Sequence, residues 1–174
     1  MTATFRIRRL TLSEAHEATT SLAEVLADCV AGGASVGFMA AMTSAQAEAF
    51  WRRETAAGDG RAILVAEDDE GVFGVVQVIP VATPNQPHRV DVTKLLVHRR
   101  GRRRGAAEAL MAATEEAARE MGRWLMVLDT VTGSPADDLY EKRGWSRAGV
   151  IPDYALYPDG ALCDATFFYK ALRA

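Results

Sequence analysis

The sequence predicts a single α+β domain in which a mixed, mostly antiparallel sheet of about seven strands is flanked by about four helices. Its 174 residues are enough for one domain with a sizeable hydrophobic core. Apolar residues alternate at strand spacing in some segments and recur at helical spacing in others. These segments are interleaved along the chain without repeats or linkers, so we treat residues 1–174 as one domain.

The first third of the chain predicts one strand and two helices. "FRIRRL" (5–10) alternates as a short strand does, and Thr11 to Glu14 is a capping box that opens a helix ended by Gly32-Gly33. A second capping box, Thr43 to Gln46, opens the next helix. The loop between them, "GGASVGFMAAM" (32–42), contains little polar material. The apolar faces of these two helices carry Leu22, Val25, Leu26, Cys29 and Val30 in the first and Ala47, Phe50 and Trp51 in the second.

The rest of the chain predicts strands that alternate with two further helices. Residues 62–81 form a hairpin signal of strand, acidic turn and strand, and "RVDVTKLLV" (89–97) is the next strand. A helix over 106–121 and a buried strand over 123–130 follow. Ser134 and Pro135 open a short helix, Gly144 ends it, and "WSRAGV" and "ATFFYKAL" close the sheet. We expect "IPDYALYPDG" (151–160) to be a loop.

Composition limits the function classes. The net charge of −3 and the isoelectric point near 5.6 argue against a general nucleic-acid binder. Two cysteines without metal-ligand spacing indicate no metal site and a reducing, cytoplasmic setting. No apolar run of the length of a membrane span appears, and "MTATFRIRRL" lacks an apolar signal region, so we expect no membrane association.

An arginine-rich loop joins the strand over 89–97 to the helix that follows it. "RRGRRRGAA" (99–107) places five arginines in six positions before three small residues. A helix N-terminus presents unpaired N–H groups and a positive dipole end, so this arrangement predicts a pyrophosphate cradle. The spacing matches neither a Walker loop nor a dinucleotide-binding fingerprint. The alternatives are a solvated basic helix start and a nucleic-acid patch, although the loop has no aromatic residue to stack bases.

Two motifs resemble a known superfamily. Arg102-x-x-Gly105-x-Ala107 is similar to the acetyl-CoA signature of the GNAT N-acetyltransferases, and "GSPADDLYEKRGW" (133–145) is similar to that superfamily's A-x-x-x-Y-x-x-x-G-F/W segment. "GASVGF", "LDTVTGSPA" and "IPDYALYPDG" resemble the branch that contains the tabtoxin-resistance acetyltransferase. The resemblance implies a GNAT-like fold and acetyl-CoA as co-substrate. Arg103 stands where the family usually has glycine, so its side chain points outward or the backbone is less tight.

The resemblance also implies roles for individual residues. Asp91 and Asp129 are candidates for the base and the amine anchor, in an order that the sequence leaves open, and Tyr140 is the candidate general acid. Each has a plainer alternative: Asp91 pairs with Arg89, Asp129 caps the following turn, and Tyr140 packs in the core. The cofactor-binding candidates are Leu95, Leu96, Val97, Arg102, Arg103, Arg104, Gly105, Ala106, Ala107 and Ser134, of which Ser134 could also simply cap its helix. The acceptor-binding candidates are Ser35, Phe38 and Tyr154, the last of which could equally be an ordinary loop aromatic, like Tyr157.

These features predict an enzyme that transfers the acetyl group of acetyl-CoA to the amino group of a small molecule. Acidic residues suit a cationic amine, and amino-acid-like antibiotics or toxins are acceptors by resemblance, which would make the protein a resistance enzyme. The alternatives are acetylation of a protein N-terminus or lysine, and a non-catalytic domain that binds acyl-CoA. We expect a monomer or a homodimer.

Overall fold

The computed structural model describes residues 4–173 and confirms the predicted α+β fold. Seven strands form one sheet in the order β1-β2-β3-β4-β5-β7-β6, and only the β4–β5 pair within it is parallel. The strands are β1 (Arg6–Arg9), β2 (Ala62–Asp68), β3 (Gly71–Pro80), β4 (Arg89–Val97), β5 (Leu125–Val131), β6 (Ser146–Leu156) and β7 (Leu162–Ala171). The helices are α1 (Leu12–Glu17), α2 (Thr19–Ala31), α3 (Ser44–Thr55), the 3-10 helix η1 (Arg99–Gly101), α4 (Ala106–Glu120) and α5 (Pro135–Lys142).

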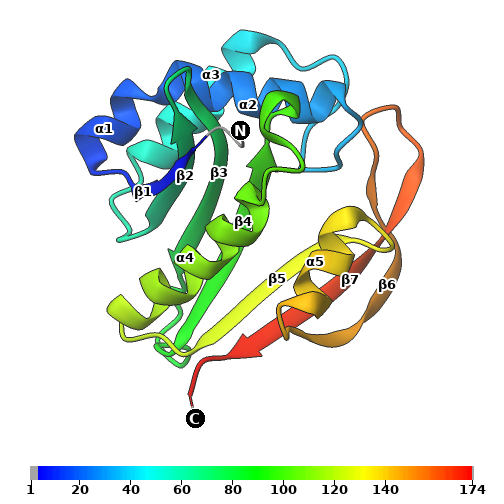
Figure 1. Cartoon of the computed structure of the whole chain (residues 1–174). Coiled ribbons are helices and arrows are strands. Elements are labelled where there is room, and N and C mark those ends of the chain that lie inside the picture. The colour runs from blue at the N-terminus through cyan, green and yellow to red at the C-terminus, as the bar shows by residue number, and fades with distance from the viewer. Residues whose placement is uncertain (1–3, 174) are drawn as a thin grey trace.

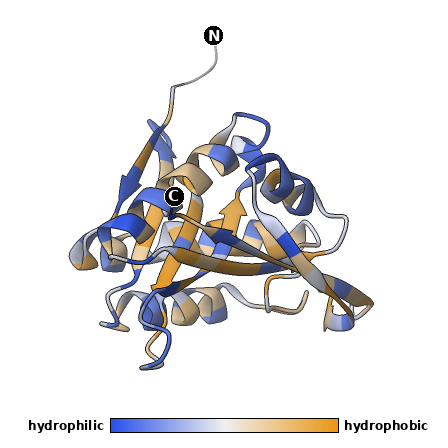
Figure 2. Ribbon diagram, turned by 90° about the horizontal axis from the view of Figure 1, so that it is seen from below, coloured by the Kyte–Doolittle hydropathy of each residue, from blue (hydrophilic) through white to orange (hydrophobic). Residues whose placement is uncertain are grey.

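The helices cover both faces of the sheet (Figure 1). Helices α4 and α5 pack on one face, where Leu110, Met111 and Tyr140 share a core with Phe73 and Phe168. Helices α1, α2 and α3 pack on the other face of the first four strands and form a second core. Figure 2 shows that the central strands are strongly hydrophobic, as expected for strands covered on both sides.

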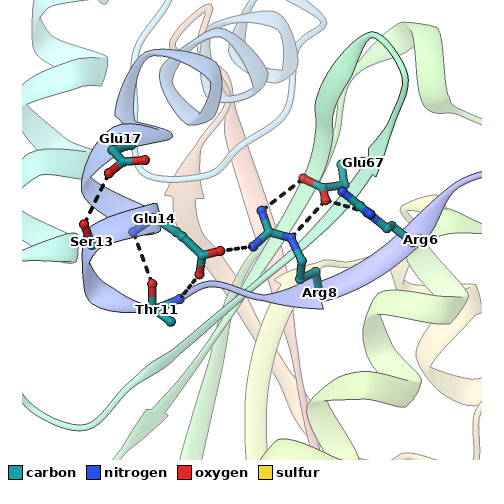
Figure 3. Close-up of polar contacts among 7 residues, drawn as sticks. All are labelled: Arg6, Arg8, Thr11, Ser13, Glu14, Glu17 and Glu67. Atoms are coloured by element: carbon teal, nitrogen blue, oxygen red, sulfur yellow. Dashed lines mark hydrogen bonds and ion pairs between the residues drawn. The ribbon is translucent and has the colours of Figure 1, made fainter.

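A polar network fixes the start of the chain to the sheet (Figure 3). Thr11 and Glu14 form the predicted capping box of α1, and Glu14 also pairs with Arg8 of β1. Hydrogen bonds from Thr11, and then the pairing with Arg8, lower the pKa of Glu14 to about 2. Glu67 of β2 accepts hydrogen bonds from Arg6 at 2.7 Å and from Arg8 at 2.9 Å. The first helix therefore begins at a defined place relative to the edge of the sheet.

Two sequence-based predictions need correction. The first helix is divided into α1 and α2 at Ala18, where the Thr19 hydroxyl donates to the carbonyl of His16 at 2.7 Å. Such local side-chain bonding competes with the regular helix ladder and bends it. The segment over 151–160, predicted as a loop, mostly continues β6, because residues up to Leu156 pair with β7. Tyr154 is thus a strand residue, and Tyr157 lies in the hairpin turn.

Strands β4 and β5 pair over three residues and then separate. The paired residues are 89–91 of β4 and 125–127 of β5, whereas β5 stays paired with β7 along its whole length. Figure 1 shows the two parallel strands close together at their starts and diverging towards their ends. The divergence opens one edge of β4 beyond Asp91 and leaves a wedge in the middle of the sheet.

The loop after β4 rests on Phe73 of β3. The ring lies 5.1 Å from the Arg100 guanidinium and 4.6 Å from that of Arg104, both within cation–π range. Gly101 is buried against the same ring, and a Cβ on this glycine would lie 2.1 Å from Cδ2 of Phe73. A side chain at position 101 would therefore force the loop away from its platform.

We expect Gly101→Ala to lower the free energy of unfolding by about 1–3 kcal/mol, because overpacking displaces either the ring or the loop. Gly149→Ala is the matched control, since a Cβ there meets nothing within 4 Å. Urea unfolding followed by circular dichroism measures both. Equal midpoints for the two variants would contradict the close packing of Gly101.

Candidate active site

The wedge between β4 and β5 contains a cavity of about 810 Å³. Its walls come from the two diverging strands, the N-terminal half of α5, the loop after α2, and the β6–β7 hairpin. The volume is in the range of pockets that hold a cofactor or a small molecule. The wall residues most relevant to chemistry are Cys29, Ser35, Lys94, Leu95, Leu96, Val97, Arg102, Ala107, Asp129, Ser134, Tyr140 and Tyr154.

One wall of the cavity is the open edge of β4. Leu95, Leu96 and Val97, the predicted cofactor-binding residues of this strand, all line it, and this edge has no β5 partner beyond Asp91. An unpaired strand edge binds extended, amide-containing chains by β-strand addition. The carbonyl of Val97 is the part of this edge already in use, because it accepts hydrogen bonds from the thiol of Cys29 and from Nε of Arg102.

Two buried carboxylates organise the arginine loop. Asp28 of α2 has a side chain only 7% exposed, and it pairs with Arg99 and accepts a hydrogen bond from the Arg99 backbone at 2.8 Å. Burial opposes ionisation of Asp28, but the hydrogen bonds from Arg99 outweigh it and lower the pKa. Asp68 of β2 holds Arg100 at 2.9 Å and Arg104 at 2.8 Å. The hydrogen bond from Arg100 is the main cause that lowers the pKa of Asp68 to about 2.

This pairing divides the predicted cofactor-binding arginines. Arg104 is directed at Asp68 and Phe73 and is not part of the cavity wall, so its position does not support the predicted contact with the cofactor. Arg102 lines the cavity, with NH2 3.9 Å from Asp28. Arg103 is exposed at a φ of 59°, which confirms that its side chain points outward. Arg102 and Arg103 are therefore the arginines of this loop placed to meet an anion.

The start of α4 has the features of an anion site. Gly105 occupies the N-cap with a φ of 82°, and no side chain in the described part of the molecule caps this helix. Helices α1, α3 and α5 are instead capped by Thr11, Thr43 and Ser134. The space around a Cβ at Gly105 is empty, which leaves room for a phosphate to approach the backbone. Ala106 is buried, and Ala107 lines the cavity next to Arg102.

Asp129 is the carboxylate that the fold brings into the cavity. It lies on β5 two residues beyond the last pair with β4, recessed in the wedge yet open to solvent through the cavity. Burial raises its pKa, Lys94 acts in the opposite direction, and the charge of Asp91 adds to the increase. Asp129 therefore combines access to a ligand with a basicity above that of an ordinary aspartate.

Asp91 has a different environment. It is the last β4 residue paired with β5, it lies outside the cavity wall, and its Oδ2 is 3.4 Å from NH2 of Arg89. The pairing with Arg89 that the sequence allowed is thus observed. The position of Asp91 does not support direct contact with an acceptor.

Tyr140 lines the cavity from α5 while its ring is buried. The ring centroid lies 5.8 Å from that of Trp145 and 5.6 Å from that of Phe168, so Tyr140 also has the packing role that was its alternative. Burial, followed by the charge of Asp129, raises the pKa of Tyr140. The hydroxyl stays protonated and makes no hydrogen bond within residues 4–173, which leaves it available as a donor to a ligand. Ser134 caps α5 and also lines the cavity.

The predicted acceptor residues are divided between the cavity and the core. Ser35 lines the cavity, and its hydroxyl donates to the carbonyl of Leu156 at 2.6 Å. Tyr154 lines it from β6, with its ring against Phe167. Phe38 does not line the cavity; it packs edge-to-face on Phe50, so its predicted contact with the acceptor is not supported.

Lys94 is the cavity residue that the sequence analysis missed. It has a φ of 55° at a bulge in β4, and burial lowers the pKa of its ammonium. A signal for the bulge exists in the sequence. Val90 and Val92 lie on one face of the strand, two residues apart. The next residues of that face are Leu95 and Val97, so the spacing from Val92 to Leu95 is three residues instead of two.

Residues 4–173 contain neither a metal-binding cluster nor a membrane-spanning helix. No group of three or more His, Cys, Asp or Glu side chains there could hold a metal ion. Within the same residues, no helix combines the length and the apolar character that crossing a bilayer requires.

Comparison with known proteins identifies similar chains. Residues 59–147 match the model of the acetyltransferase (GNAT) domain. A human protein named N-acetyltransferase 8 is 35% identical over 92 residues, which are 52% of this chain and 40% of that protein, so the match spans less than half of the relative. Ribosomal-protein-alanine N-acetyltransferase from Brucella melitensis superposes with a TM-score of 0.79 at 21% identity, covering 96% of this chain and 99% of that one. A GNAT superfamily phosphinothricin acetyltransferase from Sinorhizobium meliloti, solved with acetyl-CoA, gives a TM-score of 0.78 at 20% identity, covering 99% and 89%.

The left-handed backbone at Arg103 predicts a stabilising substitution. We expect Arg103→Gly to raise the free energy of unfolding by about 0.5–1 kcal/mol, because glycine removes the cost of this conformation but loses more chain entropy on folding. The melting temperature should rise by roughly 2–4 °C per kcal/mol in a domain of this size. Arg103→Ala is the control, since it removes the same side chain and keeps the strain. Equal stabilisation by alanine would show that the side chain, not the backbone, is responsible.

Proposed function

Because the chain belongs to the acetyltransferase (GNAT) family, we propose that it transfers the acetyl group of acetyl-CoA to the amino group of a small molecule. The start of α4 with Arg102 and Arg103 would hold the phosphates of the cofactor, and the open edge of β4 would hold its amide-containing arm. When bound, acetyl-CoA supplies an activated acetyl thioester. The backbone N–H groups of the β4 edge are the available donors to its carbonyl oxygen.

We propose a small acceptor because one end of the cavity is closed. The loop after α2 is tied to the β6–β7 hairpin by the hydrogen bond from Ser35 to Leu156 and by another from the Ala40 backbone to Pro158 at 3.0 Å. Figure 1 shows this loop reaching the hairpin across the wedge. A polypeptide acceptor needs an open groove, whereas this bridge limits the acceptor to a molecule that fits beneath it.

Asp129 and Tyr140 provide the proton transfers. An acceptor amine reaches the site mainly protonated, because free amines titrate near ~10. The Asp129 carboxylate takes this proton, directly or through water, and leaves the nitrogen lone pair free to attack. The Tyr140 hydroxyl then donates its proton to the departing sulfur. A carboxylate suits the role of base and a phenol that of acid, so we assign Asp129 as the base and Tyr140 as the acid.

The finer assignments are part of the proposal. The similarity to a phosphinothricin acetyltransferase supports the branch that contains the tabtoxin-resistance enzyme, and hence an antibiotic or toxin as acceptor. The similarity to a ribosomal-protein-alanine N-acetyltransferase supports the competing protein acceptor. A thiol-release assay with acetyl-CoA, run on a panel of small amines and on N-terminal peptides, tests both. Cytoplasmic location and the choice between monomer and homodimer stay predictions.

We expect Asp129→Asn to reduce turnover by about 10²–10⁴-fold, because the amide shape is kept and the base is lost. The same change should leave the melting temperature at neutral pH equal or higher. Because folding raises the pKa of Asp129, its protonated carboxyl favours the folded state; this contribution is complete below the unfolded pKa and is lost as pH rises through the folded value.

Asp91→Asn is the control for Asp129→Asn, since it removes the same charge from outside the cavity and should keep turnover within about threefold of wild type. A silent Asp129→Asn variant on a confirmed substrate would remove this residue from the mechanism. Stopped-flow thiol release and differential scanning calorimetry give the two measurements.

Tyr140→Phe should lower kcat by about 10²-fold and leave the melting temperature and acetyl-CoA affinity close to wild type, because only the hydroxyl is removed. Tyr140→Ala should in addition cost about 3–5 kcal/mol of stability, as for other large-to-small core substitutions. Steady-state kinetics and thermal melts separate the two roles. If Tyr140→Phe is fully active, the ring serves packing alone and water protonates the leaving group.

A further inference from the structure

Lys94 is held in a backbone conformation that a lysine adopts at a cost. Lys94 and Leu95 lie opposite the single residue Val76, so β4 has a bulge at this point. The φ of Lys94 is 55°, in the left-handed region, which is strained for a non-glycine residue. Bulges and strained backbone near functional sites redirect a side chain, and here the bulged residue is part of the cavity wall.

The ammonium of Lys94 has no charged partner. Its Nζ lies 5.5 Å from the centre of the Phe50 ring, and within residues 4–173 it forms neither an ion pair nor a hydrogen bond. Glu54, the carboxylate of α3 whose charge it senses, is already paired with Arg61 and Arg53. The ammonium is half-buried and still reached by solvent, so an anionic ligand in the cavity can provide the hydrogen-bond acceptor that residues 4–173 do not.

Asp129 faces the same part of the wedge from the other strand. Lys94 is three residues beyond the last β4–β5 pair and Asp129 is two residues beyond it, so both lie near the apex. Their charges influence each other's pKa, yet they form no ion pair. The cavity wall therefore contains a cationic and an anionic residue that are not paired with each other.

The geometry points to Lys94 as a specificity-determining residue that binds an anionic group on the acceptor, so that the acceptor is a zwitterion. The acceptor's amino group is directed to Asp129, and a carboxylate or phosphorus oxyanion of the same molecule is directed to Lys94. This inference rests on the proposed function and deepens it, because it selects small amino-acid-like acceptors over simple amines and polyamines. If position 94 had only a structural role, glycine would be the more stable residue there, because glycine adopts this φ without strain.

The test compares acceptors that differ in one charge. L-methionine, L-glutamate and glycine are each assayed beside their α-carboxamides in wild type and in Lys94→Met, which keeps an unbranched side chain over Phe50 and removes the charge. An amino acid and its α-carboxamide differ in the basicity of the amine, which affects both proteins equally. For each protein we therefore divide kcat/KM for the acid by kcat/KM for the amide, and compare this ratio between wild type and Lys94→Met. We expect this ratio to fall by about tenfold or more in Lys94→Met, mainly through a higher KM for the acid.

Two further variants control the comparison. Lys142→Met removes the same charge from the exposed end of α5 and should keep the wild-type ratio. Lys94→Arg retains a cation and should restore part of the preference. A ratio that favours amides in wild type, or that is unchanged in Lys94→Met, overturns the inference.

The outcome is distinguishable from failure of the proposed function. If no amine releases thiol above the rate of hydrolysis, the acetyl-transfer proposal fails, and calorimetric titration of the CoA-saturated protein with the same acids decides the binding site. Binding to wild type that is weakened about tenfold in Lys94→Met supports the anion site without turnover. Equal binding in the two proteins, or no binding to wild type, overturns it.

Discussion

The separation of β4 from β5 after three paired residues is the constraint on which the rest of the structure depends. Parallel strands joined through α4 would otherwise continue as a closed ladder with no room between them. The divergence leaves backbone groups of β4 unpaired and creates the cavity in the middle of the sheet. It also places Lys94 and Asp129 on opposite sides of one space. Binding of an extended cofactor at this edge would complete the interrupted ladder.

Most arginines of the loop after β4 form ion pairs that stabilise the loop itself. Asp28 and Asp68, from two different elements, neutralise Arg99, Arg100 and Arg104. These pairs fix the loop against Phe73 and α2, so that the start of α4 points into the cavity. Most of the positive charge of the five arginines is therefore compensated locally. The electrostatics that remain are concentrated at the uncapped helix start.

Backbone strain occurs where the site is built. Lys94, Arg103 and Asp153 are the non-glycine residues with positive φ among residues 4–173. Lys94 lies in the cavity wall, Arg103 in the anion loop, and Asp153 on β6 next to Tyr154. The backbone N–H of Asp153 donates to Asp164 at 2.9 Å, and Lys94 is held at the bulge of β4. Strained backbone of this kind is expected at functional sites. Glycine at position 94 would remove the strain and would also remove the lysine side chain.

Local patterns in the sequence determined the elements and the faces they bury. The strand predicted over 89–97 and the helix predicted over 106–121 match β4 and α4, and the capping residues Thr11, Thr43 and Ser134 placed three helix starts correctly. Such signals act over a few residues, so they are visible in the chain itself. The motif around Gly105 likewise located the start of α4.

The tertiary structure decided which side chains meet. Asp91 and Asp129 were equivalent candidates in the sequence, and only the β4–β5 divergence places Asp129 in the cavity and leaves Asp91 with Arg89. The partner of Arg99 is 71 residues away at Asp28, and that of Arg104 is 36 residues away at Asp68. The role of Lys94 depends on a bulge opposite Val76 and on Phe50 of another helix. These contacts follow from how distant segments pack, and packing of distant segments leaves no periodic mark on the local sequence.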